Sequence, residues 1–561
     1  MASVLVDYKR SLERAGIDAN RRTLPPENVP VRSNLPPSQT HPRGILMIMS
    51  RGAYLFVLIA ALATVTACSV NPVTGKSEIT FVSESSEIQM GSESYLPMQQ
   101  SQGGEYDVDP ALTEYVSGVG NRLAKVSDRE LPYEFVVLNN SVPNAWALPG
   151  GKIAVNRGLL TELNSEAELA AVLGHEIVHA AARHSAKRIE RSTLLQGVVV
   201  ATAVVTNDSD YGGLAVGGAG IGAQLLNQSY GRGDELESDK YGMLYMSRAG
   251  YDPQGAVDLQ KTFVRLSDGK EADWLTGLFA SHPPSQERVN ANTAMAAALS
   301  PGGETGADRF RAAIDKTNAV KPAYDAYDEG RKALSDKKPD LAIEQANKAI
   351  ELFADEAHFY SLRGDARIVK KQHDMALTNF NSAIRRRDDF FYYYLQRGLI
   401  QEELGHDDLA EADLEISVEM LPTAPAHYAL GRIAERRGDK VTALEHYKMV
   451  AGGQGEVAQA ASADLVRLDI GNNPSTYVLK RCDPDGSGNL VVSVKNNTSI
   501  GITGVRIAIQ YTDSSGIQQR LDRSVSGIIA PGKVVGINTG LGPYTAGSNC
   551  PVTVVAARVA E

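Results

Sequence analysis

Apolar side chains recur at helical spacing just after residue 165. Leu169, Val172, Leu173 and Ile177 stand at positions i, i+3, i+4 and i+8, so they share one face of a helix. The preceding segment Ser165-Glu166-Ala167-Glu168 is typical of a capping box, in which a serine and a glutamate satisfy the first free backbone amides of a helix. We therefore predict an amphipathic helix that begins near residue 165.

A second pattern repeats from residue 324 onward. Four glycines follow one another at intervals of 34, 34 and 33 residues, and an alanine stands twelve residues after each glycine. A period of 34 residues with small residues at fixed places is typical of tetratricopeptide repeats, in which each helix–turn–helix buries a face against its neighbours. We predict an α-solenoid of four repeats over residues 324–470. The recurring residues are Gly330, Gly364, Gly398, Gly431, Ala342, Ala376, Ala410 and Ala443.

A strand pair is predicted shortly before the helix. The strand-like run 133–138 is followed by residues 144–155, in which a Pro-Gly-Gly turn precedes an alternating apolar stretch. An edge strand at this place could hold a substrate backbone by β-addition. The alternative is an ordinary hairpin without a binding role. The substrate-binding residues expected on this strand are Asn144, Ala145, Trp146, Ala147 and Leu148.

The last part of the chain, residues 475–561, consists of short alternating runs separated by Asn, Gly and Asp turns. These runs predict a small β-sandwich. Cys482 and Cys550 lie near its first and last strands, and an even pair of cysteines in an exported chain predicts one disulfide. The alternative is two unrelated buried thiols.

Two further apolar runs, 193–206 and 212–222, follow the predicted helix. Neither reaches the roughly 20 residues that a membrane-spanning helix needs. We predict a buried or membrane-facing hairpin, or a mobile glycine-rich lid.

A targeting signal precedes Cys68. Arg51 is followed by an apolar run over residues 54–66 and by small residues that lead into the cysteine, as in a secretory signal. The residues before Cys68 also resemble a bacterial lipobox, which implies cleavage there and lipidation of Cys68; the alternative is an uncleaved membrane anchor. Ser69, by resemblance to enterobacterial lipoproteins, favours the outer membrane over the inner one.

This signal divides the beginning of the chain into three segments. We predict a lipoprotein signal peptide over residues 47–67 and a tether over residues 68–84. Residues 1–46 are polar, rich in Pro and Arg, and lack periodic apolar positions. Because Met47 and Met49 directly precede the signal, we expect translation to begin at one of them and residues 1–46 to be a disordered over-extension of the reading frame.

Length and charge limit the remaining possibilities. A chain of 561 residues is too long for one core and is expected to hold three or four domains. Its net charge of -11 and the lack of a concentrated basic stripe argue against a nucleic-acid partner.

The predicted helix carries candidate chemistry in Gly174-His175-Glu176-Ile177-Val178-His179. Residues four apart lie on the same face of a helix, so His175 and His179 can converge on one metal ion. Glu176 would then stand beside the metal, where a carboxylate can take a proton from an activated water. The alternative is a chance match, because only three positions of the pattern are fixed. Two histidines and a glutamate are nevertheless costly to bury without partners.

Two histidines leave a zinc site incomplete, because such a site normally takes three protein ligands and one water. The metzincin continuation is excluded, since Ala182 and Ser185 stand where it needs glycine and histidine. His184 falls on a different helical face and is expected to support the site or lie on the surface. The remaining candidates are carboxylates downstream, notably in residues 232–242.

Several segments together resemble a known family. They are 71–75, 144–155, 168–184, 232–242 and 281–284 together with Arg288. In this order they are similar to the zinc metallopeptidases that include the CAAX prenyl protease, the mitochondrial OMA-type protease and periplasmic proteases with tetratricopeptide repeats. The resemblance implies a mainly α, zincin-type (gluzincin) peptidase domain with a small β edge over residues 85–300, followed by a linker over residues 301–323.

The resemblance also implies residue roles around one Zn²⁺ ion per chain. Glu235, the first residue of a Glu-x-x-x-Asp pattern, becomes the third zinc ligand. Asp239 becomes a supporting residue that orients a ligand, and Arg232 becomes a second supporting residue. Ser238 departs from the alanine that the family usually has before the Asp. His282 is expected to approach the metal, either as a reversible fourth ligand or as a donor to the oxyanion. The alternative for His282 is a loop histidine that caps a Pro-Pro turn.

Two functions are compatible with these features. The first is a membrane-anchored zinc metalloendopeptidase on the periplasmic side of a bacterial envelope, which cleaves misfolded or stalled envelope proteins recruited by the repeats. The second is a chaperone or scaffold for outer-membrane protein assembly, whose protease is normally latent. The intact set of ligands favours an enzyme.

Overall fold

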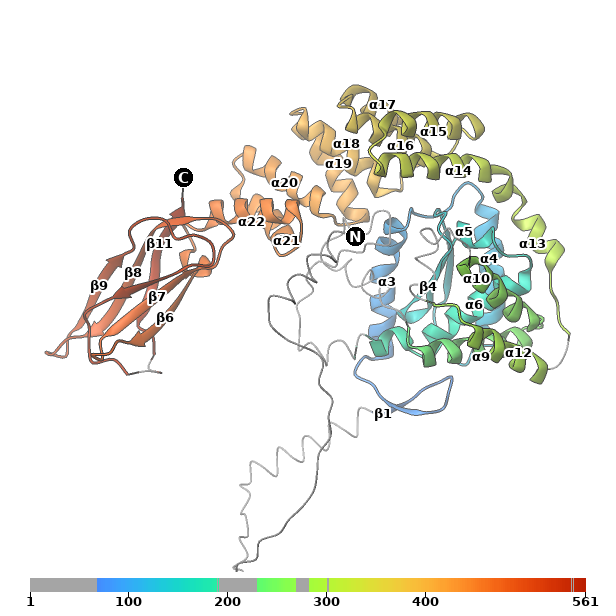
Figure 1. Cartoon of the computed structure of the whole chain (residues 1–561), viewed down its shortest axis with the longest axis horizontal. Coiled ribbons are helices and arrows are strands. Elements are labelled where there is room, and N and C mark those ends of the chain that lie inside the picture. The colour runs from blue at the N-terminus through green and yellow to red at the C-terminus, as the bar shows by residue number, and fades with distance from the viewer. Residues whose placement is uncertain are drawn as a thin grey trace, which may run out of the picture. The chain divides into compact units, whose positions relative to one another are not determined.

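The computed structural model describes residues 68–188, 190, 230–268, 282–299, 302–545, 547 and 549–560. The predicted signal peptide, the upstream residues 1–46 and the apolar runs 193–206 and 212–222 lie outside the described residues. An α/β part that carries the candidate site comes first, then a series of helices, then an all-β part (Figure 1). Within the described ranges, no helix combines the length and the apolar character needed to cross a membrane.

The α/β part packs one small sheet between helices. Its elements are β1 (Cys68–Val70), β2 (Ser77–Ile79), α3 (Glu84–Ser101), α4 (Pro110–Ala124), β3 (Glu134–Leu138), β4 (Ala145–Leu148), the 3-10 turn η1 (Pro149–Gly151), β5 (Lys152–Asn156), α5 (Arg157–Leu160), α6 (Glu166–Ala181), α9 (Arg232–Arg248), α10 (Gln254–Asp268), α12 (Gln286–Ala298) and α13 (Ala307–Ala313).

The sheet confirms the predicted strand pair. Its strand order is β3-β5-β4, with β3 parallel and β4 antiparallel to β5, so β4 lies at an edge. The chain turns between β4 and β5 at Gly150 and Gly151, whose φ angles of 77° and 87° favour glycine over any other residue. Trp146 pairs with Ala154 across the two strands.

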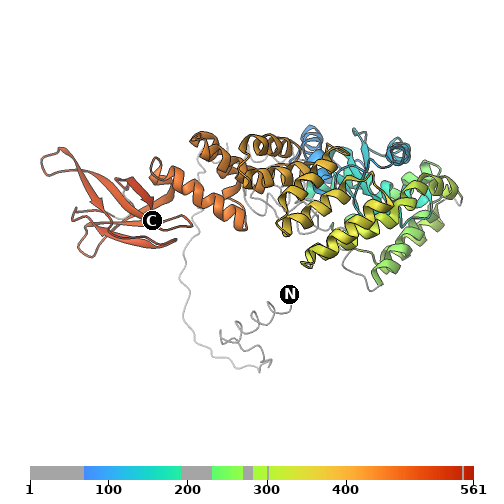
Figure 2. The same cartoon turned by 90° about the horizontal axis from the view of Figure 1, so that it is seen from above.

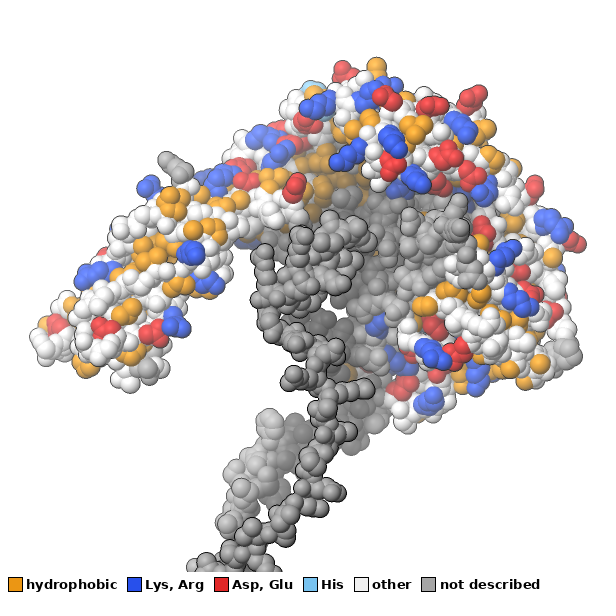
Figure 3. All heavy atoms as spheres, in the orientation of Figure 1, with side chains coloured by type: hydrophobic (Ala, Val, Ile, Leu, Met, Phe, Trp, Pro, Cys, Tyr) orange, Lys and Arg blue, Asp and Glu red, His pale blue; other side chains and the backbone are white. Residues whose placement is uncertain are grey.

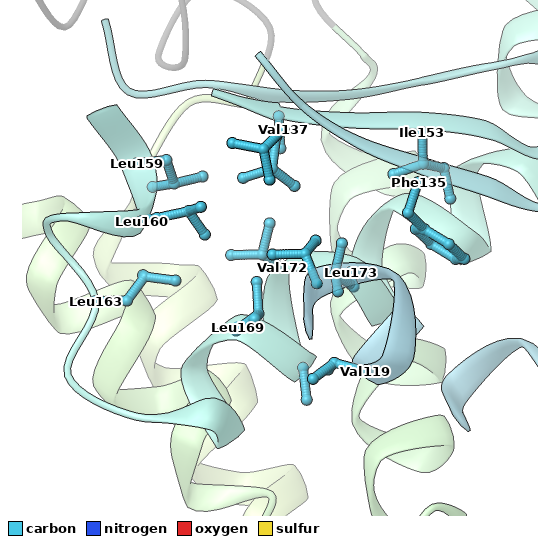
Figure 4. Packing of buried hydrophobic residues seen from close by; sticks show 14 of the residues in the cluster. Val119, Phe135, Val137, Ile153, Leu159, Leu160, Leu163, Leu169, Val172 and Leu173 are labelled. Atoms are coloured by element: carbon cyan, nitrogen blue, oxygen red, sulfur yellow. The ribbon is translucent and has the colours of Figure 1, made fainter. Parts of the chain in front are cut away.

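Each face of the sheet covers a separate group of apolar side chains. Figure 4 shows Val137 and Ile153 of the sheet and Val172 and Leu173 of α6 within one buried cluster, to which α4 also contributes. On the opposite face, α3 covers a smaller cluster. The members of that cluster are Met98, Val136, Leu138, Trp146, Leu148 and Ala154.

Helix α6 differs from the expected amphipathic helix because all of its residues are buried. Its apolar face packs on the sheet and α4, whereas its polar side faces α9 and the segment around His282. Its two histidines and Glu176 are buried at the candidate site, whereas Glu166 and Glu168 near its start accept hydrogen bonds from Arg309 and from the Asn164 amide.

The segment predicted as a tether is a hairpin rather than a free chain. β1 and β2 pair antiparallel, and the Asn71 side chain organises their turn by accepting bonds from the backbone amides of Val73 and Thr74. Asn71 also donates to the carbonyl oxygen of Ala182 at the end of α6, at 3.2 Å. Arg183 donates to the carbonyl oxygen of Val82 at 2.6 Å. The segment therefore packs against the end of the helix that carries the histidines.

The predicted repeats are present as four consecutive helix pairs followed by one further helix. Figure 2 shows them, in yellow to orange, as stacked hairpins. At Gly364 an added Cβ would lie 2.9 Å from the ring of Phe380, so this glycine is needed for close helix packing. The pairs are α14 (Asp315–Ser335) with α15 (Pro339–Leu352), α16 (Ala357–Val369) with α17 (His373–Ile384), α18 (Phe391–Glu403) with α19 (Asp407–Met420), and α20 (Ala424–Arg436) with α21 (Lys440–Ala451), before α22 (Glu456–Asp469).

The expected linker over residues 301–323 is largely helical. It contains α13 and the beginning of α14. The repeat period marks only the residues that recur, so it could not locate the start of the first helix.

The C-terminal part contains two three-stranded antiparallel sheets. Their orders are β10-β7-β6 and β11-β8-β9, and both sheets contribute to one buried cluster. Cys482 and Cys550 form the expected disulfide, with their Cα atoms 5.5 Å apart. The elements are α23 (Pro474–Tyr477), β6 (Val478–Pro484), β7 (Leu490–Asn496), β8 (Ile502–Thr512), β9 (Gln518–Ser524), β10 (Val534–Asn538) and β11 (Val552–Val559).

Candidate metal centre

Helix α6 places two histidines one turn apart. The Ser165 side chain accepts the Glu168 amide at 3.2 Å and so caps the start of the helix. The reciprocal bond of the predicted capping box goes elsewhere, because the Glu168 carboxylate accepts the Asn164 amide at 2.9 Å. From this start the helix brings the Nε2 atoms of His175 and His179 to 2.9 Å from one another.

Helix α9 supplies the predicted third donor because two glycines let it approach α6. A Cβ on Gly242 would lie 3.0 Å from the backbone nitrogen of His175, and one on Gly174 would lie 3.1 Å from the Gly242 carbonyl oxygen. The close contact brings the Glu235 carboxylate to 3.6 Å from His175 Nε2 and to 3.5 Å from His179 Nε2.

His282 joins these donors from the segment before α12. Its Nδ1 atom lies 3.2 Å from His175 Nε2 and 2.9 Å from Glu235 Oε1. One donor atom from each of the four residues lies within 4.8 Å of the others. Ligand atoms about 2.0–2.1 Å from a tetrahedral zinc ion stand roughly 3.4 Å apart. The three predicted ligands, at 2.9 to 3.6 Å, fit one Zn²⁺ ion.

Glu176 stands beside this donor set with an unsatisfied oxygen. Its Oε1 atom is 3.6 Å from His282 Nε2, and its Oε2 atom is buried without a hydrogen-bond partner in the described part of the chain. Burial raises the pKa of Glu176, although the positive charges of His282 and His175 act to lower it. A carboxylate of raised pKa that has a free oxygen is suited to accept a proton from a water molecule in the site.

Burial and the charges of neighbouring side chains set the protonation of Glu235, His179 and His282. Burial alone would raise the pKa of Glu235, but His282 and His175 hold it well below its usual value. Burial lowers the pKa of His179 well below 6.5, so this imidazole is neutral and able to ligate a metal. Burial also acts to lower the pKa of His282, but the Glu235 and Glu176 carboxylates raise it.

A buried ion pair between Asp239 and Arg288 orients His175 from the side of the ring that faces away from the other donors. Asp239 Oδ1 accepts the Nδ1 hydrogen of His175 at 2.9 Å, which leaves Nε2 directed at the donor cluster. The Arg288 guanidinium donates to both oxygens of Asp239 at 2.7 Å, and its Nη1 lies 2.8 Å from Glu235. Burial alone would raise the pKa of Asp239, but Arg288 keeps it low.

Arg232 does not reach the metal donors. Its side chain is 77% exposed and pairs with Glu287. The role expected of Arg232 belongs to Arg288, which lies on α12. Arg288 was included in the resemblance, but no local pattern in the sequence showed which carboxylate it would contact.

His184 supports the second histidine. Its Nδ1 atom lies 3.0 Å from His179 Nδ1, and its Nε2 atom lies 3.2 Å from Glu237 Oε1. If His179 ligates through Nε2, its Nδ1 hydrogen is donated to His184, whose own Nε2 hydrogen goes to Glu237. The Tyr230 ring stacks on His179 with centroids 3.8 Å apart.

The predicted substrate strand lies close to this centre. The side chains of Ala145, Trp146, Ala147 and Leu148 are buried. Ala145 also lines a cavity of about 30 Å³ that borders the donors. The backbone edge of β4 opposite β5 makes no strand pairing among the described residues.

The helix with His175, Glu176 and His179, completed by Glu235 from a second helix, defines a zincin-type metal centre. The model of peptidase family M48 matches residues 110–296. Metalloprotease YcaL of Escherichia coli K12 is 30% identical over 33% of this chain and 73% of its own length. The chain belongs to peptidase family M48.

Other relatives match shorter fractions of their length. The β-barrel assembly-enhancing protease of Yersinia pestis is 36% identical over 27% of this chain and 33% of its own. The mitochondrial metalloendopeptidase OMA1 of Schizosaccharomyces pombe is 36% identical over 32% of this chain and 51% of its own. This chain thus spans about a third to a half of the length of these two relatives. Among solved structures, MamA is 22% identical over 28% of this chain and 88% of its own, with a TM-score of 0.22.

Proposed function

We propose that this chain is a zinc metalloendopeptidase of the bacterial cell envelope, anchored to a membrane by lipid on Cys68. It would hydrolyse peptide bonds of misfolded or stalled envelope proteins. One observation carries the catalytic part of the proposal: His175, His179 and Glu235 form a complete donor set beside the unsatisfied Glu176 carboxylate.

Each residue of the site has a separate role in the proposed hydrolysis. His175, His179 and Glu235 would hold zinc, which acidifies a water and polarises the scissile carbonyl. Glu176 takes the proton of the attacking water and delivers it to the leaving amine. His282, 3.6 Å from Glu176, is placed to donate a hydrogen bond to the oxyanion. Asp239 and Arg288 keep His175 and Glu235 oriented throughout.

The envelope location rests on sequence features and on the relatives. The lipobox-like residues before Cys68 support lipid anchoring. The Yersinia pestis relative is named a β-barrel assembly-enhancing protease, which supports substrates or partners among outer-membrane proteins. The helix pairs would recruit these proteins, and Ser69 supports a position on the periplasmic side of the outer membrane. We also propose that the two C-terminal sheets form a β-sandwich.

The edge strand β4 is the proposed binding place for substrate backbone. Within the described part of the chain β4 pairs with no strand other than β5, and this edge position together with the place of Ala145 beside the donors supports β-addition of an extended peptide. Asn144, Trp146, Ala147 and Leu148 would set the position of that edge, with Trp146 and Leu148 anchored in the cluster under α3.

Cleavage of casein by the purified chain tests the catalytic proposal. Glu176→Gln should retain zinc but lose about 10²- to 10⁴-fold in rate, the usual contribution of a general acid–base group. A Glu93→Gln variant is a matched control, because the Glu93 side chain is exposed on α3 and accepts a hydrogen bond from Gln89 at 2.8 Å. Unchanged cleavage by Glu176→Gln would refute the assignment.

A latent protease that acts as a scaffold is the second candidate. The observation that favours it is the position of His282, whose Nδ1 stands among the metal donors, 2.9 Å from Glu235. A fourth protein ligand there would exclude the reacting water. Complementation of a deletion strain separates the two functions, since equal rescue by wild type and Glu176→Gln would favour the scaffold.

A further inference from the structure

The turn at the end of α6 is held in a conformation that is rare for its residue. Arg183 has a φ angle of 64°, in the left-handed region that favours glycine. Among the described residues, two other non-glycine residues share this region, Lys337 and Lys371, and both are exposed in turns between repeat helices. Charged side chains lie over the visible surface of the described residues in Figure 3, but Arg183 is only 8% exposed. A rare conformation at a buried arginine indicates that neighbouring groups impose it.

The Arg183 guanidinium is fixed by contacts with α3 and with the segment that precedes α3. It donates to the Thr80 hydroxyl at 2.7 Å and to the Val82 carbonyl oxygen at 2.6 Å, and it pairs with the buried carboxylate of Glu87. Glu190 accepts the backbone amide of Val82 at 2.8 Å, which holds that segment against the guanidinium. The backbone at Arg183 therefore cannot relax to a common conformation without loss of these bonds.

The hairpin of β1 and β2 holds the residues on both sides of this turn. The Asn71 amide group donates to the Ala182 carbonyl oxygen at 3.2 Å. This carbonyl belongs to the peptide bond between Ala182 and Arg183, so its direction is tied to the φ angle of Arg183. After the turn, Lys187 donates to the Glu78 carboxylate of β2 at 2.8 Å, and the same carboxylate oxygen accepts from Asn71 at 3.2 Å. The hairpin therefore supports the left-handed turn from outside the helix.

The turn directs His184 toward the metal centre. His184 follows Arg183 directly, and its Nδ1 atom lies 3.0 Å from Nδ1 of His179, one of the three proposed zinc ligands. If residue 183 had helical angles, the helix would continue and His184 would lie on a different face from His179. The left-handed turn thus brings the two imidazoles together. His184 can then accept the Nδ1 hydrogen of His179 and leave Nε2 for the metal.

We propose that Arg183 is a positioning residue of the metal centre, and that the N-terminal hairpin acts through it. The contacts of Arg183 and Asn71 maintain the left-handed turn, the turn places His184, and His184 orients the His179 imidazole. The segment after Cys68 is then a support of the metal centre as well as the link to the proposed lipid anchor. The inference rests on the proposed function, because it takes His179 as a zinc ligand.

Two substitutions at residue 183 separate the backbone conformation from the contacts of the side chain. Arg183→Ala and Arg183→Gly both lose every contact of the guanidinium, but only glycine adopts the left-handed conformation without strain. We expect Arg183→Ala to bind zinc at least about tenfold more weakly than the parent, the usual loss when a ligand is no longer oriented. Arg183→Gly should bind zinc at least about threefold more tightly than Arg183→Ala, because its turn is not strained.

Two measurements on the full chain report these differences. Zinc affinity is measured by competition with a chromogenic chelator. The visible absorption of Co²⁺ bound in place of zinc reports the arrangement of the ligands. We expect the Co²⁺ spectrum of Arg183→Gly to resemble that of the parent more closely than the spectrum of Arg183→Ala does. A side chain that only stabilised the fold would not make the two variants differ in this way.

A substitution in the hairpin tests its part independently and decides the question if the variants at residue 183 fail to fold. Asn71→Asp keeps the oxygen that accepts the amides of its own turn but loses the donor to the Ala182 carbonyl oxygen. We expect zinc affinity to fall about tenfold, because the new carboxylate repels that carbonyl oxygen. Ser77→Asp is the matched control, since it adds the same charge at an exposed position of the hairpin and should leave zinc affinity unchanged.

The outcomes separate this inference from the proposed function. Unchanged zinc affinity in folded Arg183→Ala, or equal affinity in the alanine and glycine variants, would overturn the role of the left-handed turn. Unchanged affinity in folded Asn71→Asp would overturn the role of the hairpin. A parent chain that binds no zinc would instead overturn the proposed function itself. Far-UV circular dichroism shows which variants are folded.

Discussion

Replacing Asp239 by Asn should weaken zinc binding without removing a ligand. The Asp239 carboxylate accepts three hydrogen bonds, one from His175 Nδ1 at 2.9 Å and two from Arg288 at 2.7 Å. Asparagine keeps the size of the side chain, but one of its two acceptors becomes an NH₂ group that opposes the Arg288 donors. His175 is then held less firmly, and the ion pair that Arg288 keeps among the described residues is the one with Glu235.

The size of the effect follows from these contacts. Loss of a group that orients a metal-bound histidine typically costs 10- to 100-fold in metal affinity, about 1.4–2.7 kcal/mol. Breaking a buried ion pair costs about 3–5 kcal/mol of folding stability. We expect Asp239→Asn to lower the folding stability of the zinc-free chain by about 3 kcal/mol, the lower end of this range. The loss is at the lower end because the Arg288 charge keeps its contact with Glu235 at 2.8 Å.

Zinc affinity is measured by competition with a chromogenic chelator, and stability by denaturant unfolding of the zinc-free protein. Asp258→Asn on α10 is the matched control, because that carboxylate is 47% exposed and contacts Lys261 on the surface. Zinc affinity within twofold of the parent, in a folded Asp239→Asn protein, would refute the role of Asp239.

Three further predictions concern other parts of the chain. Because burial holds the pKa of His358 at about 4, below 6.5, the unfolded chain takes up a proton before the folded chain does; stability is complete above about pH 6.5 and declines toward pH 4. Unfolding free energies should show a loss of about 2 kcal/mol between pH 7 and pH 5 that is smaller in His358→Gln, and an equal loss in both proteins would contradict this. Replacing Cys482 and Cys550 by Ser should destabilise the C-terminal sheets by about 2–4 kcal/mol in thermal unfolding while casein cleavage persists; an unchanged transition would count against a stabilising disulfide. Gly364→Val places methyl groups against the ring of Phe380 and should cost at least about 1–3 kcal/mol in denaturant unfolding, whereas a neutral effect would show that the helices separate easily.

Local spacing was sufficient to predict the first half of the metal centre. His175, Glu176 and His179 lie on one helix, so helical geometry alone relates them. Glu235 and His282 come from distant segments, and only the resemblance to a family connected them with the helix. The structure brings all of these donors together.

The supporting contacts were harder to predict because they depend on tertiary packing. Arg232 and Arg288 are chemically alike, so the sequence alone did not show which of them contacts Asp239. The packing of α12 on α9 brings Arg288 to Asp239, and no spacing in the sequence indicates this packing. The hydrogen bond from His179 to His184 likewise depends on tertiary packing. It arises because the chain bends after α6, where Arg183 has a φ angle of 64°.

The fold also contains features that local sequence spacing predicted and features that depend on contacts between distant segments. The repeat period predicted the helix pairs, because each pair is stabilised mainly by its neighbours. The hairpin over residues 68–79 was missed, because its turn depends on the Asn71 side chain and its position depends on a bond to the end of α6. Strands of three residues leave too little alternation for a pattern to reveal them.

We infer that this chain is a zinc enzyme whose metal is held by His175, His179 and Glu235. The most direct measurement is the zinc content of the purified chain by atomic absorption, coupled to casein cleavage with and without 1,10-phenanthroline. We expect one zinc ion per chain, cleavage that the chelator abolishes and added zinc restores, and loss of zinc in His179→Ala. A chain that contains no zinc after incubation with the metal, or that cleaves casein equally well with the chelator present, would contradict it.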